Sequence, residues 1–205
     1  MTFNRDWFPG SVRQKAAFGW DDKTFPSEPR IHLAQDYAPP DGKRLETPAY
    51  TIMRGAVQWH IDGQGNSILR QINGDYEIRY YHFKREELSS DIIAAFEPKA
   101  IVEAGTLIGP AGNIGLKVAG NGNDGSHVHL VIVCKEDMKS QLTPLLGEGW
   151  AEDMTEKFAL NYGDGFTLEA NRWRVRWMND KVIYRFDPTT QKYAYFLNPE
   201  KVLGA

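Results

Sequence analysis

Residues 67–83 read SILRQINGDYEIRYYHF, and this stretch decides the fold class. Asn73-Gly74-Asp75 is a strong turn signal between two largely apolar segments, Ser67 to Ile72 and Tyr76 to Phe83. From Glu77 to His82 polar and apolar side chains alternate, as they do in a half-buried strand. The stretch therefore predicts two strands joined by a tight turn.

Similar segments occur elsewhere in the chain. Further strands are predicted for Tyr50 to Arg54, Ala56 to Ile61 and Val128 to Cys134. One short helix is predicted from Ser89 or Ser90 to Phe96, because a serine can cap it and Pro98 follows it. Regular short strands separated by turns favour a mainly β, antiparallel fold with short helices over an alternating α/β fold.

The pattern changes after Cys134. Residues 135–162 look largely helical, although Pro144 and Gly147-Glu148-Gly149 interrupt them. Three strand-like segments then follow, and they predict a small three-stranded meander: Arg172 to Met178, Lys181 to Asp187 and Lys192 to Leu197. We therefore expect a main domain of residues 1–137 with 198–205, and a helical and three-stranded insertion or extension over residues 138–197.

Composition excludes several classes of protein. The chain has 205 residues, 41% of them hydrophobic and 25% charged, as expected for a globular protein with its own core. The formal net charge of −3 argues against a nucleic-acid partner. No segment approaches the roughly 20 apolar residues of a membrane span. The amino terminus lacks the apolar core of a secretory signal, so as written the chain is expected to be soluble and not exported by the usual route, although a processed protein would look the same.

A single cysteine and many glycines narrow the chemistry further. Cys134 alone allows no intramolecular disulfide and no thiolate zinc cage, and its place after Val131-Ile132-Val133 indicates a buried strand residue. Residues 105–125 are rich in glycine but contain no Gly-Lys-Ser or Gly-Lys-Thr phosphate cradle. They are interpreted as tight turns, with backbone lying close to a groove.

The five histidines carry the functional signal. His127 and His129 are two apart on a predicted strand, so their side chains would share one face. His32 and Asp36 are four apart and could reach one cation if the chain turns between them. Two histidines and a carboxylate, with a fourth position open to water, form a known catalytic zinc set. His82 is either a bonded groove histidine or a functional one, and His60 is expected to be structural or superficial.

These pieces occur in the order typical of one family. The chain resembles the lysostaphin-type (LytM-like) zinc endopeptidases, peptidase family M23, whose pattern is His-x-x-x-Asp, then a strand histidine after tyrosine, then His-x-His. The resemblance covers about residues 18–134. Other segments that look like the family's are Phe18-Gly19-Trp20, Thr47 to Tyr50, Gly55-Ala56-Val57, Gly63 to Asn66, Val102 to Gly109, Gly112 to Gly115 and Asn198-Pro199.

The resemblance implies a fold, a metal and a set of roles. It implies a LytM-like antiparallel core of the duplicated-hybrid-motif or barrel-sandwich kind, and one Zn²⁺ held by His32, Asp36 and His129. His127 would take the proton from the attacking water, and His82 would bind that water or the tetrahedral oxyanion. The expected activity is zinc-dependent endopeptidase cleavage of peptidoglycan crosslink, stem or bridge peptides at the cell wall.

The sequence also departs from the family and leaves alternatives open. Ala34 and Ser126 stand where many relatives carry glycine and proline, and residues 84–100 and 138–197 are longer than usual, which puts substrate choice in doubt. One alternative is a catalytically inactive LytM-like module that binds a partner or the wall. Another is a bacteriophage virion component, on a phage tail for example, which would need no export signal. Alternating arginines at 172, 174 and 176 suggest either a solvated face or a contact with wall polymer or a partner.

Overall fold

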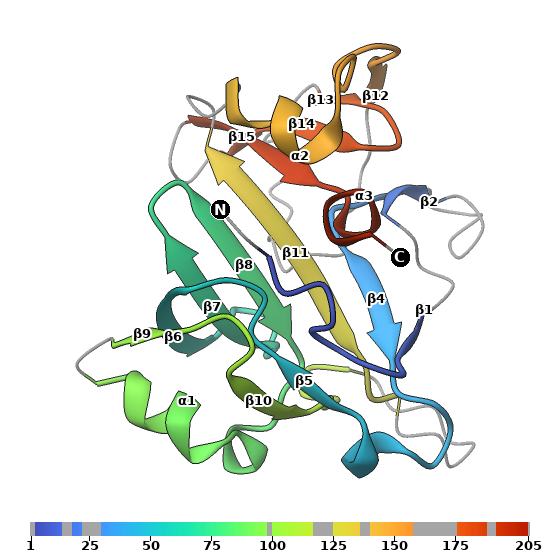
Figure 1. Ribbon diagram of the computed structural model, residues 1–205. Helices are drawn as coiled ribbons and strands as arrows, with labels where there is room; N and C mark the ends of the chain where they lie inside the picture. Colours follow the sequence, from blue (N-terminus) through green and yellow to red (C-terminus); the bar gives the residue numbers. More distant parts are fainter. Residues whose placement is uncertain are drawn as a thin grey trace. The chain divides into compact units, whose positions relative to one another are not determined.

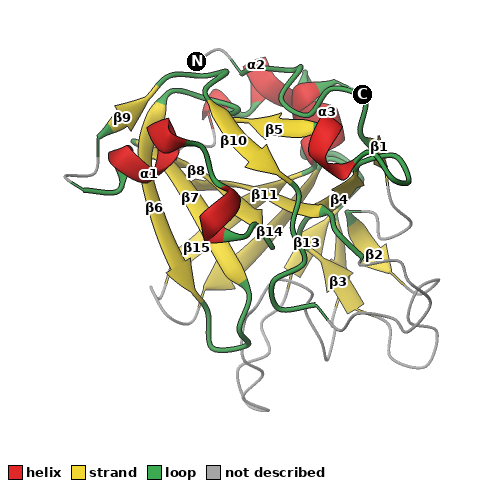
Figure 2. Cartoon of the chain, turned by 90° about the horizontal axis from the view of Figure 1, so that it is seen from below, coloured by secondary structure: helices red, strands yellow, loops and turns green. Residues whose placement is uncertain are grey.

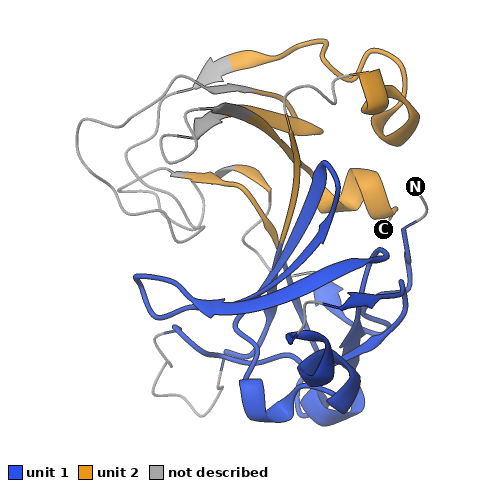
Figure 3. Cartoon of the chain, turned by 90° about the vertical axis from the view of Figure 1, so that its left-hand side faces the viewer, with its two compact units in different colours: residues 1–14, 36–130 blue, residues 15–35, 131–205 orange. Residues whose placement is uncertain are grey.

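A computed structural model describes residues 3–13, 18–21, 30–97, 100–116, 125–135, 140–157, 176–187 and 192–204. These residues form a mainly antiparallel β structure with a few short helices, as the sequence predicts (Figure 1). The chain divides into two compact units (Figure 3). Unit 1 comprises residues 1–14 and 36–130, and unit 2 comprises residues 15–35 and 131–205.

A three-stranded meander forms the centre of unit 1. Strands β6 (Gly55–Ile61), β7 (Ser67–Asn73) and β8 (Tyr76–Tyr81) pair in sequence order. Asn73 pairs with Tyr76 across Gly74, whose φ of 58° suits a residue without a Cβ. Residues 67–81 thus form the predicted hairpin, and alternate side chains from Tyr76 to Tyr80 are buried. Strand β8 ends at Tyr81, so the predicted strand position of His82 is wrong, and His82 follows the strand.

Shorter elements surround this meander in unit 1 (Figure 2). Strand β1 (Val12–Arg13) pairs with β4 (Gln35–Ala38), β5 (Pro48–Tyr50) with β10 (Leu107–Pro110), and β9 (Ile101–Val102) with β6. Two 3-10 turns cover Arg44–Glu46 and Arg85–Glu87. Helix α1 (Ser90–Ala95) begins after Ser89, whose hydroxyl accepts a hydrogen bond from the Ile92 amide, as the predicted cap requires.

A buried hydrogen-bond network ties the meander of unit 1 to the loop after β5. The Tyr80 hydroxyl donates to Gln71 Oε1 at 2.8 Å and accepts from the Ile52 amide at 2.8 Å. The Gln71 side-chain amide also donates to the Met53 carbonyl. Burial raises the pKa of Tyr80 far above its usual value, against the smaller effect of the Ile52 amide, so the phenol stays protonated.

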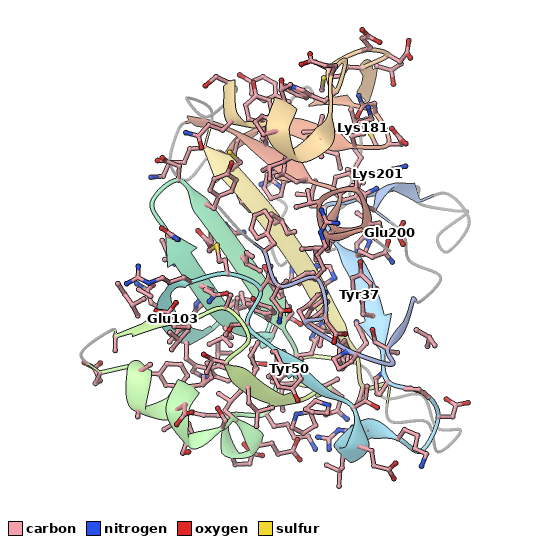
Figure 4. All side chains as sticks on the ribbon, viewed as in Figure 1. Tyr37, Tyr50, Glu103, Lys181, Glu200 and Lys201 are labelled. Atoms are coloured by element: carbon pink, nitrogen blue, oxygen red, sulfur yellow. The ribbon has the colours of Figure 1, made fainter. Side chains whose placement is uncertain are left out.

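The amino-terminal segment packs on the strand that carries Asp36. The Trp7 ring meets the Tyr37 ring of β4 edge-on, with centroids 5.3 Å apart, and the Trp7 carbonyl accepts from the Tyr50 amide of β5 at 2.6 Å. Both tyrosines are labelled in Figure 4. This packing ties the amino-terminal segment to β5 and to the residue that follows Asp36 in β4.

Unit 2 contains the rest of the β structure. Strand β2 (Gly19–Asp21) pairs with β3 (Arg30–His32), and strands β12 (Thr155–Lys157), β13 (Arg176–Met178), β14 (Val182–Asp187) and β15 (Lys192–Leu197) pair in sequence order. Strand β11 (Val128–Lys135) enters from unit 1, and its residues 132–135 pair with β15. The two helices are α2 (Thr143–Leu146) and α3 (Pro199–Leu203).

Two sequence predictions for this region are confirmed, and one is wrong. The meander of β13, β14 and β15 is confirmed, and Cys134 lies buried in β11 as predicted. The largely helical stretch over 135–162 is contradicted, because the described residues 140–157 contain one four-residue helix and then strand β12. Gly147 and Gly149 adopt positive φ angles that end the helix after one turn.

Two further predictions from the sequence concern this region and stay predictions. The division at residues 137 and 138 stays a prediction. Arg172 and Arg174, of the proposed basic face, lie outside the described residues. Within the part of the chain that is described, no helix has the length and apolar character needed to cross a membrane.

Candidate metal centre

Strand β4 pairs with β11 (Figure 1), and Asp36 of β4 lies beside His129 of β11. Both side chains are buried, and His129 Nδ1 lies 3.0 Å from Asp36 Oδ1. His127 approaches the same carboxylate oxygen, with its Nε2 3.8 Å away. The two histidines of the His-x-His motif therefore point to one side of β11, as the two-residue spacing predicts.

His32 joins this group through a short turn. It ends β3, where it pairs with Gly19, and β4 begins three residues later at Gln35. The chain bends at Leu33 and Ala34, which is the turn that a shared cation site requires. Ligand-type atoms of His32, Asp36 and His129 all lie within 4.8 Å of one another, and the three residues are buried.

The donor set suits zinc. Two imidazole nitrogens and a carboxylate oxygen are ordinary Zn²⁺ ligands, with bonds of about 2.0–2.2 Å, so two ligand atoms on one tetrahedral ion lie about 3.3 Å apart. The 3.0 Å separation of His129 Nδ1 and Asp36 Oδ1 is close to that value. A buried carboxylate flanked by imidazoles is also the environment that a cation compensates best. The three residues can therefore hold one metal ion.

His82 is held by backbone in an uncommon conformation. Its φ of 75° lies in the left-handed region, which is rarely populated outside glycine and is found at functional sites. The His82 carbonyl accepts from the Ile114 amide at 3.1 Å, and His82 Nδ1 lies 2.8 Å from the Ile114 carbonyl. Because a carbonyl only accepts, Nδ1 carries the hydrogen and Nε2 has a free lone pair.

The charge state of His82 is set by its surroundings. Burial lowers its pKa to about 3, and the neighbouring His127 and His129 act in the same direction, against weaker opposing effects of the Ile114 carbonyl and Asp36. The imidazole is therefore neutral near pH 7. Its ring centroid is 4.8 Å from that of His127 and 6.0 Å from that of His129, so the three rings form one cluster.

His127 is oriented in the same manner. Its Nδ1 lies 2.8 Å from the Gly125 carbonyl, which makes Nδ1 the protonated nitrogen and turns the basic Nε2 toward Asp36. Its amide donates to the Gly112 carbonyl at 3.0 Å, in an isolated antiparallel bridge just before β11. His127 and His82 thus both present an Nε2 lone pair.

Gly112 sets the spacing between these two histidines, and the sequence alone did not single it out. A Cβ on Gly112 would lie 2.1 Å from the His82 carbonyl oxygen, so only glycine allows the two backbones to approach so closely. The glycine-rich stretch was interpreted as backbone close to a groove, and Gly112 fits that description. The bond from His82 to the Ile114 carbonyl was not predictable, because any residue supplies a carbonyl.

Tyr81 packs beside the cluster, whereas the fifth histidine, His60, lies apart from it. The Tyr81 ring meets His129 nearly perpendicular, with centroids 4.9 Å apart, and so covers one side of a candidate ligand. His60 is exposed on β6, which agrees with the prediction that it is superficial.

Comparison with protein-family models and with curated proteins gave no match. Three solved structures are similar to the chain. The antimicrobial peptidase lysostaphin from Staphylococcus simulans is 12% identical, covering 96% of this chain and 91% of lysostaphin, with a TM-score of 0.45. A solution structure of lysostaphin is 13% identical, covering 91% of this chain and 87% of that one, with a TM-score of 0.41. CbpA from L. salivarius REN is 18% identical, covering 65% and 76%, with a TM-score of 0.40.

Proposed function

We propose that this protein is a zinc-dependent endopeptidase that hydrolyses peptide bonds in bacterial peptidoglycan. One observation carries the proposal: Asp36 Oδ1 lies 3.0 Å from His129 Nδ1 and 3.8 Å from His127 Nε2, with His32 in the same buried group. A carboxylate and two imidazoles suit a metal, and a third imidazole beside them suits proton transfer. The order of these residues in the chain, which resembles the M23 pattern, supports peptidase chemistry.

His32, Asp36 and His129 would hold the ion. Zinc bound there would lower the pKa of a coordinated water and polarise a carbonyl, which is the chemistry that amide hydrolysis needs. Asp36 serves a second purpose, because its negative charge lies beside both His127 and His129. It would therefore compensate positive charge that develops on His127 when that ring takes a proton.

His127 is proposed as the general base. Its Nδ1 is engaged by the Gly125 carbonyl, so the free Nε2 is the atom that can take a proton from water. The imidazolium so formed would lie 3.8 Å from Asp36 Oδ1, which stabilises it. The same nitrogen would then return the proton to the leaving amine.

The tautomer of His82 narrows its proposed role. A neutral imidazole with its hydrogen on Nδ1, bound to the Ile114 carbonyl, offers an acceptor and no donor at Nε2. His82 would therefore accept a hydrogen bond from the attacking water and orient it. Donation to an oxyanion would need a second proton, which burial and two neighbouring imidazoles oppose.

The substrate class rests on the resemblance and is part of the proposal. A peptidoglycan peptidase acts at the cell wall, and attachment to a phage particle stays a prediction. The inactive binding module is the competing reading. It would need neither a third imidazole at Asp36 nor an Nε2 held toward that carboxylate by the Gly125 carbonyl.

Turbidity of purified cell walls tests the proposal. Wild-type protein should clear the walls, a chelator should stop clearing, and added zinc should restore it. His129→Ala should lose both bound metal and activity, because it removes a ligand. His127→Ala should keep most of the metal and lose about a hundredfold or more of the rate, the usual contribution of a general base. Full turnover by His127→Ala would contradict the assigned role.

A further inference from the structure

A separate cavity of about 330 Å³ lies in unit 1, lined by Gln58, Trp59, Arg85, Phe96 and Glu97. None of these residues belongs to the candidate metal centre. The volume is at the low end of the range for small-molecule sites, about 300–1,000 Å³. It therefore suits a ligand of one or two small rings, not a folded partner.

The arrangement of strands explains why this cavity is open. Strand β9 pairs with β6 only at Gly55 and Ala56, so the later part of β6, including Gln58 and Trp59, lies beyond the end of β9. Helix α1 contacts β6 and β9, and Phe96 follows its last residue (Figure 2). The cavity is thus formed by ordered elements: an edge strand on one side and the end of a helix on the other.

Two aromatic rings form its apolar part, and one cation lies beside them. The Trp59 and Phe96 rings have centroids 6.3 Å apart and are tilted by 36°, and both side chains are partly exposed. The Arg85 guanidinium carbon lies 5.8 Å from the Phe96 centroid, a cation–π distance. Each ring is therefore packed against a neighbour. A ligand would meet rings whose orientation is already fixed before binding.

The polar part offers both hydrogen-bond donors and acceptors. Arg85 only donates, the Glu97 carboxylate only accepts, and the Gln58 amide does both. A pyranose ring presents C–H groups on its face, which pack on the electron-rich faces of aromatic rings, and hydroxyls on its edge, which donate and accept. A purely apolar ligand would leave the three polar side chains unused, and a simple ion would leave the two rings unused.

We propose that this cavity binds a pyranose ring of a glycan, with Trp59 and Phe96 against the sugar face and Gln58, Arg85 and Glu97 at its hydroxyls. The proposal goes beyond the peptidase function and does not depend on it, because the two sets of residues do not overlap. In an enzyme that acts on the wall, such a site would hold the polysaccharide while the peptide is cut elsewhere.

Isothermal titration calorimetry in the presence of a chelator tests the proposal without any enzymatic activity. The probes are short β-1,4-linked oligomers of N-acetylglucosamine and of glucose. Wild-type protein should bind at least one of them. Trp59→Ala should weaken binding about tenfold, the equivalent of one lost stacking contact, whereas Trp59→Phe should keep most of it.

A neighbouring residue supplies the matched control. His60 is exposed and next to Trp59 on β6 but is not among the residues that line the cavity, so His60→Ala should bind like the wild type. Thermal unfolding checks that each variant is folded. Absence of binding to either oligomer by the wild type, or unchanged binding by folded Trp59→Ala, would overturn the proposal. Binding of a sugar-free peptide in place of both oligomers would overturn it as well.

Discussion

Gly112 is the residue on which the geometry of the histidine cluster depends most closely. Gly112→Ala would bring a methyl group to 2.1 Å from the His82 carbonyl oxygen, so the backbone of His82 must move. We expect wall-clearing activity to fall at least about tenfold and the free energy of unfolding to fall by about 1–3 kcal/mol, as in overpacked cores. Zinc content should change little, because the three ligands lie on other segments.

Gly63 provides the control for this prediction. A Cβ there would meet nothing within 4 Å, so Gly63→Ala makes the same chemical change in open space. Activity assays and urea unfolding of the two variants should separate them. Equal activity of Gly112→Ala and Gly63→Ala would show that the close approach to His82 does not matter.

Glu77 is the residue whose ionisation should make stability depend on pH. Burial raises its pKa, but hydrogen bonds and charge from Arg70 and Arg79 outweigh burial and lower the pKa from 4.5 to about 2. A carboxyl whose pKa falls on folding stabilises the protein above the unfolded value and loses that contribution as pH falls through the folded value. The loss should therefore occur between the two values.

The size of this effect is measurable. A shift of this extent corresponds to roughly 3 kcal/mol at neutral pH. Urea unfolding of wild type and Glu77→Gln at pH 7 should show a difference of this order, and the difference should shrink as the pH falls toward 2. A difference that stays constant over that range would contradict the assigned ion pairs.

Strands β7 and β8 depend on Tyr80 and Gln71 for their connection to the loop after β5. Tyr80→Phe removes one hydroxyl that serves both the Ile52 amide and Gln71 Oε1 in a buried place. We expect a loss of about 1–3 kcal/mol in the free energy of unfolding, the usual penalty for unsatisfied buried groups. Combined with Gln71→Leu, the loss should be smaller than the sum of the single losses, because both changes break one network. Additive losses would argue against that network.

Elements with strong local patterns were predictable from the sequence. The hairpin over residues 67–81 followed from its alternation and its Asn73-Gly74-Asp75 turn, and α1 followed from its serine cap. Residues 140–157 were not predictable in the same manner. Local propensity favoured helix there, whereas residues 155–157 form β12 by pairing with β13, about twenty positions later in the chain.

The sequence predicted which residues make up the candidate site, but not how their rings are protonated. Spacing gave His127 and His129, because a strand places alternate residues on one face, and the resemblance to the M23 pattern joined His32 and Asp36 to them. They did not give the tautomers. Those depend on the carbonyls of Gly125 and Ile114, which any sequence would supply and only the fold aims at a ring. The structure thus added which ring nitrogen carries the hydrogen in His127 and in His82.

Considered as a whole, the chain combines a buried histidine and aspartate group with an independent aromatic cavity. Both are formed by described residues, and the cavity and its lining lie within unit 1. If both proposals hold, cleavage and polysaccharide binding use different residues. The chelator should then abolish the first and leave the second intact.

Mass spectrometry of the fragments released from purified peptidoglycan tests the central claim most directly. We predict peptide fragments with new amino and carboxyl ends, each formed by uptake of one water per bond, and intact glycan chains. These fragments should disappear with a chelator and return with zinc. Release of glycan fragments instead, or peptide fragments that persist in the chelator, would contradict a zinc-dependent endopeptidase.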